Sequence, residues 1–201
     1  MTANTTIECL FYSHVWTIYE LENLGFIKTG DELLIELATE SRFAPVFDRS
    51  EKTSKGIVSL LQPGFSIHKL AFRHSTIKAP IVLAPNPPVA IENQLSALSL
   101  LPSIENHADK VIVLIHINDA PSFEPAFAIM DNFSIVWDMA DFPGIALSAL
   151  GRSLLNQQCL NKETWKGFFL CNHPNRKLPD IKIRESVLRK LLNQFPVLKA
   201  A

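Results

Sequence analysis

Glycine is scarce in this sequence, with only seven glycines among 201 residues. Loops that cradle phosphate groups with their backbone N–H groups need several closely spaced glycines. Neither the Gly-x-x-x-x-Gly-Lys pattern nor the Gly-x-Gly-x-x-Gly pattern occurs, and no Ser or Cys stands in a nucleophile-elbow context. These absences argue against nucleotide-dependent catalysis and against a serine or cysteine hydrolase.

Cysteines and long apolar runs are also few. The three cysteines, Cys9, Cys159 and Cys171, are odd in number and widely spaced, which favours reduced thiols over a disulfide framework. The longest strongly apolar run, Val111 to Ile115, is far shorter than the roughly 20 residues that a membrane-spanning helix needs. The first residues lack the basic and apolar regions of a signal peptide. We therefore expect a cytoplasmic protein with no membrane partner.

Charge is nearly balanced overall, at −1, but unevenly distributed. Residues 1–51 hold three basic and nine acidic residues, whereas residues 170–201 hold seven basic and two acidic residues. Ends of opposite charge can attract each other within the fold, across a dimer, or on separate partners. This polarity predicts protein partners, including self-association as a homo-oligomer. The acidic N-terminal part predicts no nucleic-acid partner, because DNA binding depends strongly on cationic side chains.

The region from Ile77 to Leu155 alternates between apolar runs typical of buried strands and segments with helical periodicity. The strand runs are 81–84, 111–115 and 133–137, and the helical segments include 89–101 and 145–155. Short crossovers of this kind connect parallel neighbours. The predicted fold is therefore α/β, with a central, mostly parallel sheet of about four to five strands flanked by helices.

The first 48 residues are predicted to form a helical segment. Ser13 is suited to cap a first helix that ends at Gly25, and Thr29 and Glu32 have the spacing of a capping box before a second helix. Two helices joined by a tight turn would suggest a helix-turn-helix. The second helix would present carboxylates to DNA phosphates, so a small helical cap on the sheet is the favoured interpretation.

The last part of the chain, 161–201, is predicted to be a loop and an amphipathic helix that packs on the α/β core at 57–160 or on a partner. The three parts together are expected to form one compact domain. The helical periodicity begins after Pro179, and basic residues flank the apolar face. The predicted partner-binding residues are Ile183, Val187, Arg189, Lys190 and Leu191.

Polar residues follow each predicted strand of the core. Because the carboxyl ends of parallel strands share one edge of a sheet, these side chains could converge in one crevice. Such a group could bind Mg²⁺ through carboxylates or use a histidine base oriented by an acid. The competing interpretation is structural, with the acids capping helices and turns. The candidate ligand-binding residues are Asn86, His116, Asp119, Asp138 and Asp141.

The tetrapeptide Pro85-Asn86-Pro87-Pro88 resembles the Asn-Pro-Pro-aromatic motif of amino-group DNA methyltransferases. In that family the Asn side chain and a proline carbonyl receive the target amine. Val89 stands where the family has its aromatic residue, and the glycine-rich loop for the methyl donor is absent. A rigid turn with few backbone donors is the favoured interpretation.

Two hypotheses follow. The favoured one is a non-catalytic cytosolic adaptor or accessory subunit that acts through protein contacts, with no cofactor, no metal and no catalytic residue. The alternative is a small-molecule- or metal-binding α/β enzyme whose site lies at the carboxyl ends of the strands.

Overall fold

A computed structural model gives the structure of the chain, and it describes residues 5–49, 55–101, 108, 110–141, 145–157, 159 and 163–171. All seven strands of the described residues belong to one sheet, in the order β3-β4-β2-β5-β1-β6-β7. Every neighbouring pair is parallel except β3 and β4 at one edge. The strands are β1 (Thr6–Tyr12), β2 (Leu33–Leu37), β3 (Phe72–His74), β4 (Ile77–Val82), β5 (Lys110–His116), β6 (Asn132–Asp138) and β7 (Trp165–Cys171).

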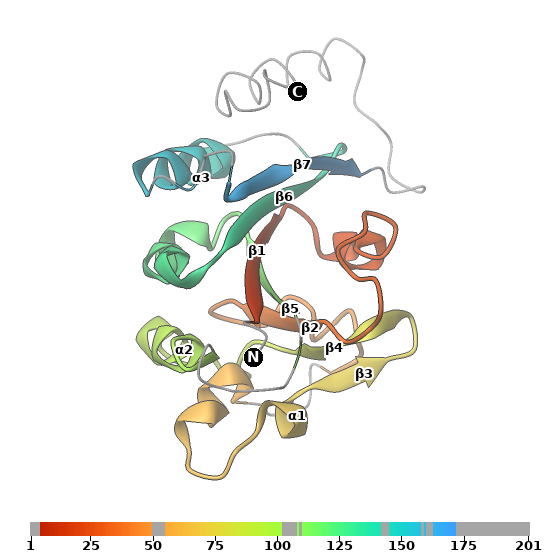
Figure 1. Cartoon of the computed structure of the whole chain (residues 1–201), viewed down its shortest axis with the longest axis vertical. Helices are drawn as coiled ribbons and strands as arrows, with labels where there is room; N and C mark the ends of the chain where they lie inside the picture. Colours follow the sequence, from red (N-terminus) through yellow and green to blue (C-terminus); the bar gives the residue numbers. More distant parts are fainter. Residues whose placement is uncertain are drawn as a thin grey trace.

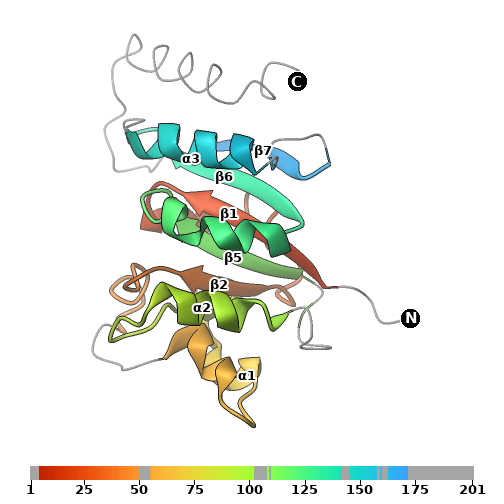
Figure 2. The ribbon, with the colours of Figure 1, turned by 90° about the vertical axis from the view of Figure 1, so that its left-hand side faces the viewer.

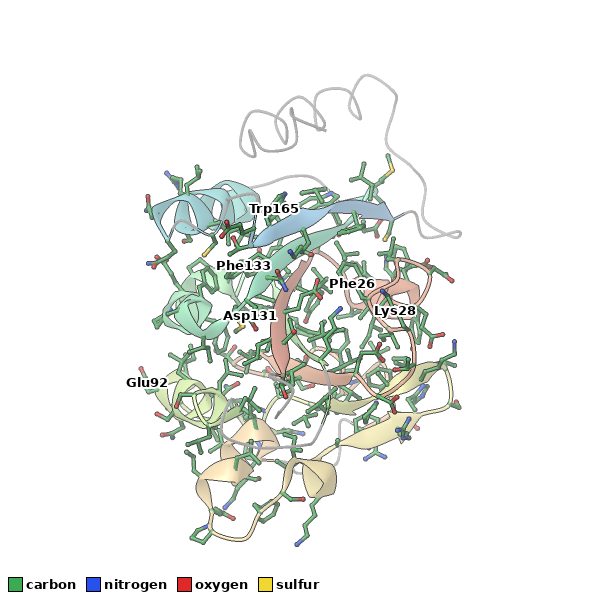
Figure 3. The ribbon with its side chains drawn as sticks, viewed as in Figure 1. Phe26, Lys28, Glu92, Asp131, Phe133 and Trp165 are labelled. Atoms are coloured by element: carbon green, nitrogen blue, oxygen red, sulfur yellow. The ribbon has the colours of Figure 1, made fainter. Side chains whose placement is uncertain are left out.

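Most helical elements cover the same side of this sheet, here called the helical face (Figures 1 and 2). Strand residues such as Phe11, Ile35 and Ile135 pack there against the helices. Figure 3 places Glu92 of the second α-helix on this side and Phe26 and Lys28 on the other. The helical elements of this face are η2 (Gly56–Leu61), α1 (Ile67–Leu70), α2 (Ile91–Leu98), η4 (Ala120–Ile129) and α3 (Ile145–Asn156).

The opposite side, here called the loop face, is covered by the segment after β1 and the loop after β2. Strand residues Leu10, Leu34 and Ile112 pack there, with aromatic side chains such as Trp16 and Phe43 above them. The central strands are therefore apolar on both sides, as parallel strands buried between two layers are. The segment after β1 contains the 3₁₀ helix η1 (Val15–Glu20).

The prediction of an α/β fold with a mostly parallel sheet is confirmed, and the sheet is larger than predicted. The helix α3 lies where the sequence placed it, and β4, β5 and β6 contain or overlap the predicted apolar runs. No described helix is long and apolar enough to cross a membrane.

The N-terminal segment differs from the prediction of two helices, because it contributes the strands β1 and β2 to the sheet. The Thr29 and Glu32 pair that resembled a capping box serves a turn instead. The Glu32 carboxylate accepts the backbone N–H groups of Lys28 and Gly30, both at 2.8 Å, and a strand follows. A carboxylate that caps a turn and one that caps a helix leave the same sequence pattern.

The helix expected to end at Gly25 is shorter than predicted, because the 3₁₀ helix η1 ends at Glu20 and Gly25 lies in the turn that follows, with a φ of +77°. The cap of that helix is His14, one residue after the expected Ser13. At the other end of the chain, β7 adds a strand within the segment expected to begin with a loop. The predicted amphipathic helix and its residues Ile183, Val187, Arg189, Lys190 and Leu191 lie outside the described residues.

Two glycines offer a matched test of the packing beside the end of β4. Gly56 and Gly25 both have positive φ, but a Cβ at Gly56 would lie 2.6 Å from the carbonyl oxygen of Leu83, while a Cβ at Gly25 would meet nothing within 4 Å. We expect Gly25→Ala to lower the free energy of unfolding by about 1 kcal/mol through backbone strain. Gly56→Ala should lower it by at least about 1 kcal/mol more, because the neighbouring backbone must move. Urea denaturation measures both, and equal losses would contradict this packing.

Candidate functional site

The carboxyl end of β1 is the point where the connections of the sheet diverge. The segment after β1 crosses the loop face, whereas the elements after β5 and β6 lie on the helical face. Since β1 lies between β5 and β6, the three departing chains border the position beyond its end, here called the crevice, which the protein's own side chains fill. Ligands of open α/β sheets bind at such points. This edge is therefore the expected position of a ligand site.

The crevice is closed by the residue that follows β1. Ser13 donates its backbone N–H to the carbonyl of Val136 at 3.2 Å, and its hydroxyl accepts the N–H of Asp138 at 2.8 Å. Its own carbonyl lies 3.0 Å from Nε2 of His116. One buried serine thus fastens the start of this loop to the ends of both neighbouring strands.

Asp138 is fully buried behind this loop and forms part of the closure. Its carboxylate accepts the indole N–H of Trp16 at 2.7 Å and the backbone N–H of Ala140 at 2.9 Å. A buried carboxylate needs such donors, because an unpaired one would be very unfavourable. Asp138 therefore holds the two connecting loops of β1 and β6 together.

His116 is half-buried at the end of β5, and both of its ring nitrogens have partners. Nδ1 accepts the N–H of Asn118 at 3.2 Å, so Nε2 carries the proton and donates it to the carbonyl of Ser13. Burial lowers the pKa of His116, and the positive charge of Arg42 lowers it further. The ring is consequently neutral and has a structural role in this arrangement.

The neighbouring end of β5 carries an ion pair that reaches across to the loop after β2. The guanidinium of Arg42 contacts both carboxylate oxygens of Asp119, through Nε and Nη2, each at 3.0 Å. The Arg42 side chain is 37% exposed and that of Asp119 is 15% exposed. The pKa of Arg42 is raised by the hydrogen bonds to Asp119, which keeps this side chain charged. Two-point pairing of this kind fixes the orientation of the guanidinium plane.

Tyr12 ends β1 beneath this pair and is 1% exposed. Its ring lies against Phe43, with centroids 5.0 Å apart, and edge-on to His116 at 5.3 Å. Its hydroxyl has no hydrogen-bond partner among the described residues. Burial raises the pKa of Tyr12 well above its usual value, and the charge of Glu36 adds to the rise. The hydroxyl is therefore a neutral group with a free donor and acceptor.

Glu36, near the end of β2, holds the loop that carries Arg42. One carboxylate oxygen accepts the N–H groups of Arg42 and Phe43, and the other accepts the Ser41 hydroxyl and the N–H of Ala84 after β4. The side chain is fully buried, and burial raises its pKa despite these four donors. Glu36 thus fixes two loops at the sheet edge.

The five predicted site residues share this edge, but they do not form one cluster. Asp119 belongs to the exposed ion pair, while His116 and Asp138 close the crevice beyond β1. Asp141 follows β6, and its backbone carbonyl accepts the indole N–H of Trp137 at 3.2 Å. Asn86 follows β4 and begins the cis peptide bond to Pro87. No group of three or more His, Cys, Asp or Glu among the described residues could hold a metal ion, so the alternative of a magnesium site at these residues finds no support there.

Sequence reasoning missed Arg42, Tyr12 and Glu36. Arg42 lies in a loop after a strand that was predicted to be a helix, so its place at the sheet edge was hidden. Glu36 interrupts an apolar run and is fully buried, and a single acid inside a buried strand was a usable signal. Nothing in the sequence pattern marks Tyr12.

No protein-family model matches this sequence, and no curated protein matches it. Solved structures do resemble the fold. A plasmid partition protein from Borrelia burgdorferi bound to AMPPNP is 12% identical, with a TM-score of 0.58 over 94% of this chain and 81% of that one. The kinase domain of VpsO is 15% identical, with a TM-score of 0.55 over 85% and 86%. The MinC:MinD cell division protein complex from Aquifex aeolicus is 15% identical, with a TM-score of 0.51 over 80% and 67%.

The chain therefore has a ParA/MinD-like P-loop NTPase fold. This finding overturns the favoured hypothesis of a non-catalytic adaptor or accessory subunit, because the solved structures that share the fold include a kinase domain and a protein bound to AMPPNP. The alternative, a small-molecule- or metal-binding α/β enzyme with a site at the strand ends, agrees better with it. One of these solved structures is a complex of two different proteins, and contact of the present chain with a partner stays a prediction.

The loop after β1 departs from the glycine-rich loop of P-loop proteins. In that motif a strand leads into glycines and a lysine that surround phosphate groups. Here β1 leads into Ser13-His14-Val15-Trp16, with neither glycine nor lysine, and this segment is fastened to Asp138. The fold is shared, but the usual phosphate-binding residues are absent from this chain.

The closed crevice makes stability depend on the protonation of His116. Its folded-state pKa is lowered, so stability from the neutral ring is present above pH about 6.5 and is lost as the pH falls towards the folded pKa. His116→Gln keeps an N–H that can reach the Ser13 carbonyl but does not titrate. We expect the difference in unfolding free energy between the wild type and this variant to shrink from pH 7.5 to pH 5.5. A difference that stays constant in urea denaturation would contradict the neutral assignment.

Proposed function

We propose that this chain binds an anionic small molecule at the carboxyl ends of β1, β2 and β5, with Arg42 as its main contact, and that nucleotides are the first class to test. The observation that carries this proposal is the half-exposed, oriented guanidinium of Arg42. A guanidinium has five N–H donors, and Asp119 uses two of them. The other three have no acceptor among the described residues, so they can bind a phosphate or carboxylate.

The electrostatics of the site favour this use of Arg42. Asp119 compensates the charge of Arg42, but it also fixes the plane of the Arg42 guanidinium. Little side-chain entropy of Arg42 is therefore lost when an anion binds. Glu36 directs its carboxylate at backbone N–H groups and the Ser41 hydroxyl, so that charge is already compensated within the protein. An incoming anion would therefore meet the oriented guanidinium of Arg42, on a loop whose backbone is fixed by Glu36.

This mode of binding replaces the backbone cradle of P-loop proteins with side chains. AMPPNP is bound in one of the solved structures that share the fold, and ligands of open α/β sheets bind at this same edge. With Ser13 and Trp16 fastened to Asp138, phosphate groups would be displaced from the end of β1 towards the Arg42 and Asp119 pair. The proposal therefore concerns a ligand at the β2 side of the crevice.

A thermal-shift and calorimetric screen with AMPPNP, sugar phosphates and dicarboxylates tests the proposal. A ligand at 100 times its dissociation constant should stabilise the wild type by about 2.7 kcal/mol. Arg42→Gln should weaken binding at least about tenfold, and Arg42→Lys should bind more weakly than the wild type because it loses the two-point geometry.

The matched control is Arg152→Gln, which removes an exposed arginine from α3 and should leave binding unchanged. Circular dichroism establishes that each variant is folded. Equal affinity of the Arg42→Gln variant and the wild type, or a well-folded wild type that binds none of these compounds, would refute the proposal.

A further inference from the structure

A hollow lies between the segment after β1 and the β3–β4 hairpin, away from the strand ends described above. It has a volume of about 590 Å³, within the usual range for small-molecule sites. Its walls include Glu22, Thr29 and Gly30 on one side and Arg73, Thr76 and Lys78 on the other. We call it the hairpin groove. Figure 1 shows the yellow hairpin of β3 and β4 and the orange segment that precedes β2.

The hairpin groove is built from tight backbone contacts. A Cβ at Gly30 would lie 3.3 Å from the carbonyl oxygen of Lys78, so the glycine lets the two segments approach closely. Glu22 then joins them, because its carboxylate accepts the backbone N–H of Lys78 at 3.0 Å and contacts the Lys78 ammonium at 2.8 Å. Arg73 donates to the same Lys78 carbonyl at 2.7 Å. The cationic groups are thereby held beside one hollow.

The donors in the groove exceed its acceptors. Among the described contacts, Arg73 uses one of its five N–H donors, and the Lys78 ammonium uses one of its three. The single carboxylate on its walls is Glu22, against the two cations Arg73 and Lys78. A hydrogen bond to Lys78 lowers the pKa of Glu22. This carboxylate is therefore ionised and pairs with the Lys78 ammonium. The groove remains positive overall.

We propose that the hairpin groove binds the phosphate group of a small phosphorylated compound, with Arg73 and Lys78 as the charged contacts. Arginine and lysine together are the usual partners of phosphate oxygens. The Thr76 side chain lies on the same wall as these two cations. Glu22 is a built-in competitor in this arrangement, because an incoming phosphate must share or take the Lys78 ammonium from it.

Because Glu22 competes with phosphate for Lys78, variants of the groove should change the affinity for phosphate in opposite directions. The full chain is titrated with inorganic pyrophosphate and, separately, with inorganic phosphate, while backbone amide resonances are followed by NMR. We expect shifts at Thr29 to Asp31 and at Ser75 to Lys78. Arg73→Gln and Lys78→Gln should each weaken binding about tenfold, while Glu22→Gln should strengthen it several-fold by releasing Lys78.

Arg152→Gln and Arg42→Gln are the controls, and neither should change the affinity at this groove. The second also separates this site from the one at the strand ends, so either site can fail alone. Loss of binding in Arg42→Gln, unchanged affinity in Arg73→Gln, or weaker binding in Glu22→Gln would overturn the proposal. Absence of amide shifts around the groove with both probes would overturn it as well.

Discussion

The arrangement of this molecule depends on how the chain leaves β1. Ser13 and Trp16 are fastened to Asp138, and Ser13 also meets His116, so the first loop is bound to the ends of both neighbouring strands. In an open parallel sheet this is the position where ligands enter. The hydrogen bonds that close it fill the crevice with the protein's own buried polar groups. In this closure Asp138 accepts the indole N–H of Trp16, and His116 bonds the backbone carbonyl of Ser13.

A second buried carboxylate organises the adjacent part of the same edge. Glu36 joins the loop after β2 to the end of β4 through four hydrogen bonds, and this loop carries Arg42. Desolvation of Glu36 is unfavourable, but removing its donors or its oxygens would leave buried groups unpaired. The result is a rigid frame with one half-exposed, oriented cation above the buried Tyr12 hydroxyl. Anion binding at this point is the function that we propose for this frame.

The sequence was sufficient to predict the core of the sheet, because continuous apolar runs such as Val111 to Ile115 have few alternatives to a buried strand. The prediction from sequence was wrong where local signals are ambiguous. Leu33 to Leu37 follows a carboxylate that resembles a helix cap, yet Glu32 closes a turn and long-range pairing with β5 makes the segment a strand. The prediction of the site missed Arg42 for a related reason. Arg42 and Asp119 are 77 residues apart, and no local pattern predicts their contact. The scarcity of glycine was taken as evidence against nucleotide-dependent catalysis, yet one solved structure that shares the fold is bound to AMPPNP, so this absence did not exclude the fold.

The most direct test of this account is hydrogen exchange at the indole N–H of Trp16, measured by NMR without and with AMPPNP and Mg²⁺. The bond to Asp138 at 2.7 Å should protect this proton in the free protein. We expect the protection and the resonance position to persist when the nucleotide is added, because a ligand at Arg42 leaves the loop after β1 closed. Loss of protection on addition of the nucleotide would mean that the loop opens to receive phosphate, which would contradict the account.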